Sequence, residues 1–363
     1  MNIIKRSGAE TQFDLAKITA AVEKANDSVP DNEKMSKEQI LSILKQNAGQ
    51  YVSGEEISRT LGVTRAAVSK AVAALRKEGY VITSATNRGY RLEESPDRLT
   101  EGTVRPWLHT ERLGKNLLCL DCIDSTNNYL KRLALEGAPD GTVAVADEQT
   151  AGRGRLGRSF QSPPGTGIYL SILLRPAVVP EKAVNLTACT AVAMCDAVQA
   201  AVGVRPQIKW TNDVLLDKRK ICGILTEMSV EGETGTLQYI VVGIGVNVNQ
   251  QLSDFPEELR SVAGSVAMVA GHPIDRGRLA AEIVNAMDRM YADWLNGVWS
   301  VDRYRADCAT LGREVRVIRA GGEREAVAEA VDDEFGLVVR YPDGTRETVF
   351  SGEVSVRGLE GYI

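Results

Sequence analysis

Apolar residues recur at helical spacing in three segments near the N-terminus. Ser36 and Gln39 have the spacing of a capping box before the first segment, and Ser53 and Glu56 repeat that signature before the second. Thr64 can cap the third segment. The apolar stripe of this third segment predicts a buried face made of Val68, Ala71, Val72 and Leu75. The pattern therefore predicts three short helices in succession.

The pattern then changes to short β-rich runs. The stretch "YVITSATNRGYRL" predicts two strands around the turn Asn87-Arg88-Gly89. Three helices followed by such a hairpin are typical of a winged helix-turn-helix, whose third helix meets base edges with its exposed N-terminal face. On this interpretation the DNA-binding residues are Arg65, Ala66, Ser69, Lys70 and, on the wing, Arg88. A small helical protein-interaction domain would share the three helices.

The rest of the chain alternates between strand-like and helical segments. Residues 93–100 are polar, contain Pro96, and predict a linker. Strands are predicted within "NLLCLDCIDS" and "TVAVA", and a long amphipathic helix over residues 181–203. The tail has short strands and the turns Gly321-Gly322 and Asp343-Gly344, which favour a small β-barrel. We therefore predict an α+β protein divided into an extension (1–35), a winged helix-turn-helix (36–92), a linker (93–100), a central domain (101–309) and a C-terminal domain (310–363).

Charge is distributed unevenly along the chain. The net charge is −5, yet residues 36–92 carry nine Lys and Arg against four Asp and Glu, a net +5. A basic module on an acidic protein indicates a face for a polyanion and favours DNA over a protein partner. The tail from Thr310 onward has a net charge of −4, so nucleic acid is not expected there.

Composition excludes several other classes. The six cysteines are scattered, which predicts reduced thiols in the cytoplasm rather than a disulfide framework. The two histidines, His109 and His272, are far apart, so a histidine-based metal or acid–base site is poorly supported. The N-terminus lacks the apolar core of a signal peptide, and no uncharged apolar run reaches the ~20 residues of a membrane helix. No membrane partner is expected.

The loop "TAGRGRLGRSF" (150–160) contains the pattern G-x-G-x-x-G. A dinucleotide-binding turn needs a helix directly after the glycines. Here Pro163 and Pro164 follow, and neither fits a helix interior. The loop instead carries three guanidinium groups among its glycines, on Arg153, Arg155 and Arg158. We therefore predict a mobile cationic loop that closes over an anion, although a solvated surface loop has the same composition.

Four further motifs occur in a fixed order around this loop: "IDSTNNYL" (123–130) before it, then "KWTND" (209–213), "KRKICGIL" (218–225) and "GIGVNVN" (243–249). Together with "GRGRLGR" they make the chain, from about Ser36 to its end, resemble the bifunctional biotin–protein ligases and biotin-operon repressors of bacteria. The family more often has proline where this chain has Thr211, and often has tryptophan where this chain has Phe160.

The resemblance implies a fold and a two-step reaction. The central domain would be a mixed-sheet, class II synthetase-like ligase domain with helices on one side, and the tail an SH3-like domain. Biotin and ATP, with Mg²⁺, would form biotinyl-5′-AMP, and the biotinyl group would pass to a lysine of a biotin carrier protein. The other implied partners are operator DNA and a second copy of the chain in a ligand-promoted homodimer.

The resemblance also implies roles for individual residues. Lys220, Arg153 and Arg155 would be catalytic, with Asp213 on the magnesium side. The residues expected to bind biotin are Ser125, Thr126, Asn127, Gln149, Arg153, Gly154, Arg155, Lys220, Gly223, Leu225, Gly243 and Gly245. Those expected to bind the nucleotide are Lys209, Asn212, Asp213, Asn247 and Arg158, while Glu353 and Arg357 match tail residues near the family's active site. Taken singly, Ser125 could be only a helix cap and Lys220 only part of a solvated charge run.

Two alternatives stay open for the whole chain. The helix-turn-helix could be a structural appendage of a ligase that does not repress. The enzyme could also be a lipoate or octanoate ligase, since these share the catalytic fold. Residues 1–35 resemble the opening of an ATP-cone, with Lys5, Arg6 and Lys17 at its phosphate-handling positions, but they cover only about a third of such a domain. We interpret them as a remnant or an appended hairpin and helix.

Overall fold

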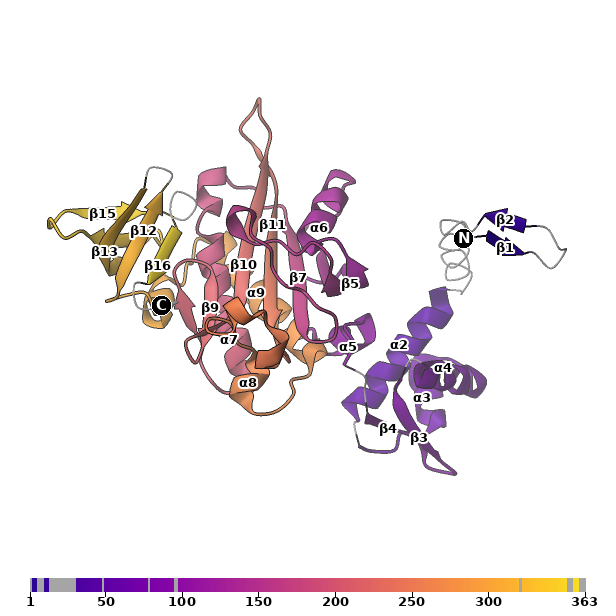
Figure 1. Ribbon diagram of the computed structural model, residues 1–363. Coiled ribbons are helices and arrows are strands. Elements are labelled where there is room, and N and C mark those ends of the chain that lie inside the picture. The colour runs from indigo at the N-terminus through magenta and orange to yellow at the C-terminus, as the bar shows by residue number, and fades with distance from the viewer. Residues whose placement is uncertain are drawn as a thin grey trace. The chain divides into compact units, whose positions relative to one another are not determined.

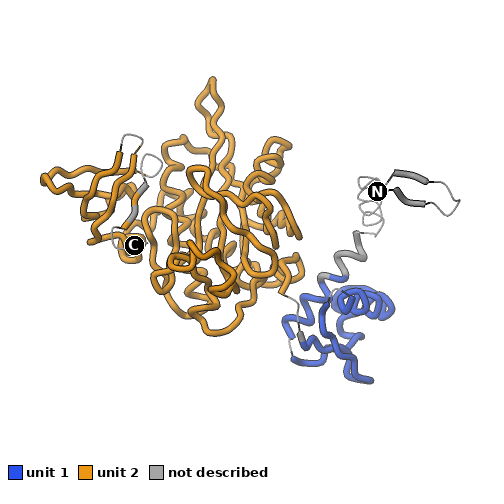
Figure 2. The backbone as a smooth tube through the Cα atoms, in the orientation of Figure 1, with its two compact units in different colours: residues 1–96 blue, residues 97–363 orange. Residues whose placement is uncertain are grey.

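The computed structural model of the chain describes residues 2–4, 10–12, 31–47, 49–77, 79–94, 97–319, 322–350 and 355–358. The predictions for Lys5, Arg6, Lys17 and Glu353, and for the side chain of Arg357, lie outside this description. The chain forms two compact units, residues 1–96 and residues 97–363 (Figure 2). Each unit is described separately below.

The first unit contains the predicted helix-turn-helix and its wing. Its elements are β1 (Asn2–Ile4), β2 (Glu10–Gln12), α2 (Asp31–Gln46), α3 (Gly54–Leu61), α4 (Arg65–Lys77), β3 (Val81–Ala85) and β4 (Gly89–Glu94). Strands β3 and β4 pair antiparallel around a turn in which Asn87 and Gly89 both have positive φ. The three helices and the hairpin wing are thus confirmed.

Most of the predicted local signals operate in this unit. The Glu56 amide donates to Ser53 Oγ over 3.0 Å, and the Ala67 amide donates to Thr64 Oγ1 over 3.1 Å, so both N-caps form. The predicted α4 face, Val68, Ala71, Val72 and Leu75, is buried. The start of the first helix was wrong, because α2 begins at Asp31 and runs through Ser36. A capping signature marks where a helix can begin, and helix-compatible residues upstream extend it.

The second unit is built on a seven-stranded mixed sheet with the strand order β5-β6-β7-β11-β10-β9-β8 (Figure 1). Strands β5 and β6 are parallel, and the other neighbouring pairs are antiparallel. The strands are β5 (Leu117–Ile123), β6 (Val143–Gln149), β7 (Gly167–Leu174), β8 (Gln207–Lys209), β9 (Asp213–Leu216), β10 (Arg219–Val230) and β11 (Leu237–Asn247). This confirms the predicted mixed sheet and the strands over "NLLCLDCIDS" and "TVAVA".

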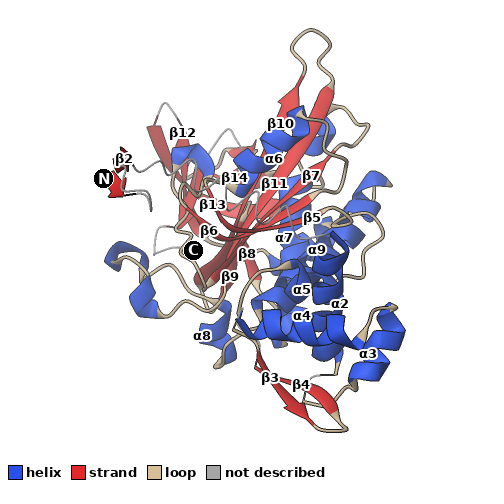
Figure 3. Cartoon of the chain, turned by 90° about the vertical axis from the view of Figure 1, so that its right-hand side faces the viewer, coloured by secondary structure: helices blue, strands red, loops and turns tan. Residues whose placement is uncertain are grey.

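Helices cover both faces of this sheet. The helices are α5 (Glu101–Val104), α6 (Thr126–Leu135), α7 (Leu186–Val202), α8 (Val266–Ala270), α9 (Arg276–Leu295) and α10 (Val301–Asp307), and the 3₁₀ turns are Arg105–Trp107, Arg155–Gly157, Pro180–Ala183, Leu252–Asp254 and Glu257–Leu259. Helices α7 and α9 pack together against one face, in the main hydrophobic core (Figure 3). Helix α6 packs on the other face, where Leu130 meets Leu173 and Val241. The expectation of helices on one side only was therefore wrong for α6.

Helix α7 was predicted to be amphipathic, and that was also wrong. Eleven of its 17 residues are buried, on all sides of the helix, because α9, α10 and the sheet surround it. Among the described residues, Pro180–Val202 is the one helical segment long and apolar enough to cross a membrane, and 72% of its most apolar 18-residue stretch is buried inside the protein. A helix that is apolar all round fits the core of a large domain.

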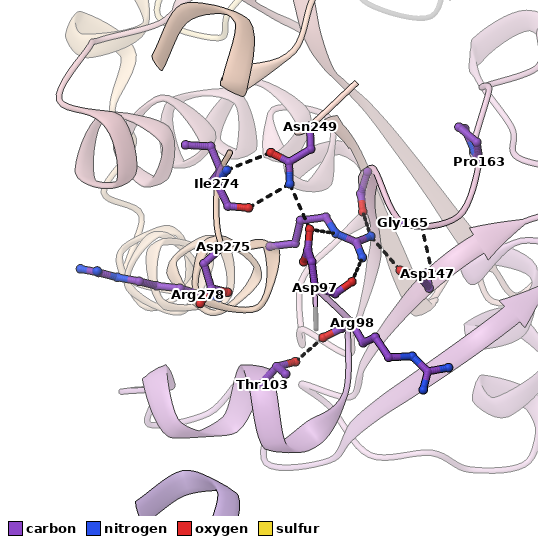
Figure 4. A network of polar contacts seen from close by, with 12 residues as sticks. Asp97, Arg98, Thr103, Asp147, Pro163, Gly165, Asn249, Ile274, Asp275 and Arg278 are labelled. Atoms are coloured by element: carbon purple, nitrogen blue, oxygen red, sulfur yellow. Dashed lines mark hydrogen bonds and ion pairs between the residues drawn. The ribbon is translucent and has the colours of Figure 1, made fainter. Parts of the chain in front are cut away.

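A buried arginine, Arg276, joins several segments of this unit, and its partners Asp97 and Asp147 are labelled in Figure 4. The Arg276 side chain is fully buried, and its guanidinium pairs with Asp97 over 2.9 Å and with Asp147 over 2.7 Å. It also donates to the Gly167 carbonyl over 2.9 Å. Asn249 donates to the same Asp97 carboxylate over 3.0 Å. The second half of the predicted linker, from Asp97 on, is therefore fixed to the ends of three sheet strands.

The tail folds as the predicted small all-β domain. Five antiparallel strands follow the order β15-β14-β13-β12-β16, and Trp210 Nε1 donates to the Phe335 carbonyl across to the central domain over 2.9 Å. The strands are β12 (Glu314–Arg319), β13 (Gly322–Val331), β14 (Leu337–Arg340), β15 (Arg346–Val349) and β16 (Ser355–Gly358).

Candidate active site

The central sheet carries a cavity of about 570 Å³ on the face that α6 covers. Its wall is formed by small or apolar residues of two paired strands, where Gly223 lies opposite Gly245 and Leu225 opposite Gly243. The predicted site residues that line it are Ser125, Thr126, Asn127, Gln149, Arg153, Gly154, Arg155, Arg158, Lys209, Asn212, Asp213, Lys220, Gly223, Leu225, Gly243 and Gly245. Segments separated by up to 120 residues in the chain are thus brought to one place.

Neutral polar groups gather at the β5–β6 end of the cavity. Thr126 N and Thr126 Oγ1 both lie within hydrogen-bond distance of Gln149 Oε1, at 2.9 and 3.1 Å. Ser125 occupies the N-cap position of α6 but makes no side-chain capping hydrogen bond. Its role is therefore not that of an ordinary cap. Hydroxyls and amides of this kind can recognise an uncharged polar ring by donating and accepting together.

Cationic groups gather at the opposite, β8–β10 end. Lys220 Nζ lies 2.7 Å from Asp213 Oδ1, and Arg155 donates to Asn212 Oδ1 over 2.9 Å. Lys209 is buried at the end of β8. Burial lowers the pKa of Arg155, while the Asp213 carboxylate opposes that change. This end of the cavity suits phosphate and carboxylate groups, because it offers several positive charges in a partly desolvated space.

The arginine loop is a small hydrogen-bonded hairpin beside the cavity. The Gly154 amide donates to the Arg158 carbonyl over 2.7 Å, and the Phe160 amide to the Gly152 carbonyl over 2.9 Å. No helix follows it, since β7 is the next element after residues 163–166. The rejection of a dinucleotide-binding turn is therefore confirmed. The loop's mobility stays a prediction.

Two wall positions require glycine because other groups approach them closely. A Cβ atom on Gly243 would lie 2.2 Å from Asn127 Oδ1. A Cβ atom on Gly245 would lie 2.7 Å from the Phe160 ring. Phe160 therefore lies against the glycine wall, where the family often has tryptophan, and it retains an aromatic surface there.

One predicted residue is not part of the cavity lining, and several lining residues were not predicted. Asn247 follows Gly245 on the same face of β11 but is not in the lining, and its Nδ2 lies 3.5 Å from the Lys220 carbonyl. The unpredicted lining residues include Tyr169, Leu259, Val262 and Arg316. Ser171, directly opposite Gly243 in the β7–β11 register, supports the site from behind. Strand register would have revealed Tyr169 and Ser171, but the sequence pattern alone does not provide it.

The first unit carries a second candidate face, formed by α4 and the wing. Arg65, Ala66, Ser69, Lys70 and Arg88 are all exposed. Arg65 forms an ion pair with Glu55 of α3. The Arg88 guanidinium lies 4.4 Å from the centre of the Tyr51 ring. These contacts hold two basic side chains at the start of α4 and on the wing.

Comparison with known proteins matches this organisation. The pattern of the Biotin/lipoate A/B protein ligase family matches residues 119–247, an HTH domain pattern matches residues 36–91, and that of the Biotin protein ligase C terminal domain matches residues 310–357. The chain is 36% identical over 319 residues to the Bifunctional ligase/repressor BirA of Bacillus spizizenii, covering 87% of this chain and 97% of that protein. The chain belongs to the biotin protein ligase family.

Other members of the biotin protein ligase family give the same result. The Biotin--[acetyl-CoA-carboxylase] ligase of Mycobacterium tuberculosis is 33% identical over 237 residues, covering 63% of this chain and 85% of that protein. Among solved structures, the biotin protein ligase from Aquifex aeolicus in complex with biotin and ATP superposes with a TM-score of 0.58 at 28% identity, covering 67% of this chain and 99% of that one.

Proposed function

We propose that this protein is an ATP-dependent biotin–protein ligase that also acts as a biotin-responsive, DNA-binding repressor. The observation that carries the enzymatic half is the division of one cavity into a neutral polar end and a cationic end, joined by a glycine wall. Biotin has the matching division, with an uncharged ureido ring at one end and a carboxylate at the other. Family membership along nearly the whole length of a ligase/repressor relative supports both halves.

In the first step, a carboxylate oxygen of biotin attacks the α-phosphorus of ATP. A mixed anhydride forms between the carboxylate oxygen and the α-phosphorus, the bond from the α-phosphorus to the α–β bridging oxygen breaks, and pyrophosphate leaves. Both reactants are anions, so the main requirement is to neutralise charge as it develops. Lys220, Arg153 and Arg155 would do this, with Lys209, Asn212 and Arg158 toward the nucleotide. The Lys220–Asp213 ion pair holds the Lys220 ammonium at the cationic end beforehand.

In the second step, the lysine amine of a biotin carrier protein attacks the acyl carbon of biotinyl-5′-AMP. An amide forms, the bond to the phosphate oxygen breaks, AMP leaves and the amine loses a proton. The biotin ring would stay on Ser125, Thr126, Asn127 and Gln149 through both steps. The arginine loop would cover the reactive adenylate until the carrier arrives.

Magnesium would enter with the nucleotide. In the described part of the chain, no group of three or more His, Cys, Asp or Glu side chains could hold a metal ion by itself. Mg²⁺ commonly uses one or two carboxylates together with substrate phosphates, so it needs no protein cage. Asp213, which faces the cationic end, would be the protein ligand, and the metal would offset charge on the phosphates.

The regulatory half of the proposal concerns the winged helix-turn-helix. The exposed start of α4 and the wing would contact operator DNA, and a symmetric operator would be read by a homodimer. The adenylate would favour the dimer by ordering the arginine loop and the segment around residues 246–249, since a loop ordered beforehand lowers the entropy cost of association. We expect the protein to bind both partners, the carrier protein and operator DNA, in the cytoplasm.

Sedimentation velocity beside a DNA-shift assay tests this half. We expect a weak dimer without ligand, a tighter one with biotinyl-5′-AMP, and DNA binding that follows dimer formation. If the adenylate changes neither association nor DNA affinity, the helix-turn-helix is a structural appendage of a ligase.

The enzymatic half is tested by pyrophosphate release with ATP and either biotin, lipoate or octanoate. We expect biotin to support release at a micromolar-to-millimolar KM, and the two fatty acids to support little. Release with lipoate or octanoate but not with biotin would favour a lipoate or octanoate ligase. The matched family includes lipoate as well as biotin ligases.

A further inference from the structure

A carboxylate outside the predicted site set stands at the junction of the cavity and the arginine loop. Glu227 lies in β10, two residues beyond Leu225 and on the same face of the sheet. Its side chain is 23% exposed. Oε1 accepts hydrogen bonds from Lys131 Nζ over 2.9 Å and from Arg153 over 3.1 Å. Oε2 accepts one from Asn127 Nδ2 over 2.9 Å.

This arrangement fixes the orientation of the Asn127 amide. A carboxylate can only accept hydrogen bonds, so Asn127 must present its NH₂ group to Glu227 and its oxygen to the other side. There Ser171 Oγ donates to Asn127 Oδ1 over 2.6 Å. Ser171 Oγ also lies 2.7 Å from Thr126 Oγ1, so the Ser171 hydroxyl bridges Asn127 and Thr126. One anion thereby sets which side of the Asn127 amide donates and which side accepts.

The same carboxylate holds the loop. Arg153 is bound at two points outside the loop, by Glu227 and by Asn128 Oδ1 at 3.0 Å. Asn128 belongs to α6 and Glu227 to β10, so the loop is fixed to both elements. Burial raises the pKa of Glu227, but hydrogen bonds from Asn127 and Lys131 and the charges of Lys131 and Arg153 outweigh burial and lower it overall. The group is therefore anionic at neutral pH.

We propose that Glu227 is a positioning residue of this ligase: its carboxylate orients Asn127 toward the substrate ring and docks Arg153 so that the loop retains the adenylate. This inference rests on the proposed function. It couples the binding of the neutral ring to the closure of the cationic loop through one side chain. Glu227 itself does not line the cavity and acts through Asn127 and Arg153.

Glu227→Gln tests the proposal with almost no change of shape. Glutamine has one accepting side, whereas Glu227 faces donors on both oxygens. The variant must therefore set its NH₂ group against Asn127 or against Lys131 and Arg153. We expect the KM for biotin in pyrophosphate release to rise about tenfold, kcat to stay within about threefold, and labelling of a bystander protein by escaped adenylate to increase. Glu231→Gln, an exposed position beyond β10, is the matched control.

The outcomes separate the inference from the function it rests on. If the wild-type protein releases no pyrophosphate with biotin, the proposed function fails. If the wild type is active but Glu227→Gln keeps its KM and its bystander labelling within about twofold, the inference alone is overturned. A loss of kcat with an unchanged KM would also overturn it, because that result indicates a damaged fold rather than altered positioning.

If Glu227→Gln does not fold, a second variant tests the docking of the loop. Asn128→Ala removes the other anchor of Arg153 and leaves Asn127 in place. We expect bystander labelling to rise at least threefold with little change in the KM for biotin. Unchanged labelling in a folded Asn128→Ala variant would contradict the docking of the loop.

Discussion

In the proposed mechanism, Lys220 is the residue on which the chemistry depends most directly. Its ammonium lies 2.7 Å from Asp213 at the cationic end of the cavity, where two anionic substrates would meet. Lys220→Ala should lower adenylate formation by about two orders of magnitude, the size of a lost oxyanion-type donor, while the fold stays intact. Pyrophosphate release at saturating substrates measures this. Lys182→Ala, which changes an exposed lysine before α7, is the control. If Lys220→Ala releases pyrophosphate within threefold of wild type, Lys220 does not have this role.

The glycine wall makes a separate prediction about space. A methyl group on Gly245 would lie 2.7 Å from the Phe160 ring, so the ring must move or the strand must shift. Overpacking of this kind costs about 1–3 kcal/mol, and we expect the KM for biotin in Gly245→Ala to rise about tenfold or more. At Gly232, where a Cβ atom would meet nothing within 4 Å, the same substitution should have no effect. Equal KM values for the two variants would contradict the wall.

At this scale the sequence predicted the residues that belong to ordered motifs and missed those that belong to strand register. Arg153, Lys220 and Gly243 stand in recognisable strings of residues. Ser171 and Glu227 stand in ordinary strands, and their importance follows from which residues lie opposite them. Asn247 shows the converse, because its motif is clear yet it is not part of the cavity lining.

At the scale of elements, Arg276 joins α9 to strands β6 and β7 and to the first residue of the second unit. Its fully buried side chain pairs with Asp97 and Asp147, and both aspartates are labelled in Figure 4. Replacing one partner of a buried ion pair leaves the other charge uncompensated, which costs about 3–5 kcal/mol of folding free energy. Because Asp97 is partly exposed to solvent, we expect a cost at the low end of this range. Arg276→Met should therefore lower the melting temperature markedly. Arg289→Met, exposed on the same helix, should leave it near wild type; equal melting temperatures would refute the role of the pair.

Periodicity succeeded for elements with one buried face and failed for those with two. The α4 stripe was predicted residue by residue because its other face is solvated. Helix α7 has little polar surface, so its apolar pattern does not indicate which side of the helix is buried. The start of α2 at Asp31 shows a further limit, since a local capping signal cannot exclude an earlier start.

At the scale of the whole molecule, the charge division separates two tasks. The basic exposed start of α4 belongs to the first unit, and the ligase cavity belongs to the second. Arg65→Ala or Lys70→Ala should each weaken operator binding about tenfold without altering pyrophosphate release. Lys77→Ala, at the far end of α4, is the control in a DNA-shift assay at fixed salt. A parallel loss of ligation in Arg65→Ala would mean that the two tasks are not separate.

The most direct test of the central claim is the intact mass of a purified biotin carrier domain after incubation with this protein, ATP, Mg²⁺ and equal concentrations of biotin and lipoate. The claim predicts that the carrier gains one biotinyl group on a single lysine, that the gain requires ATP, and that Lys220→Ala abolishes most of it. A carrier that gains lipoate instead, or that stays unmodified while the wild-type protein is folded, would contradict the account.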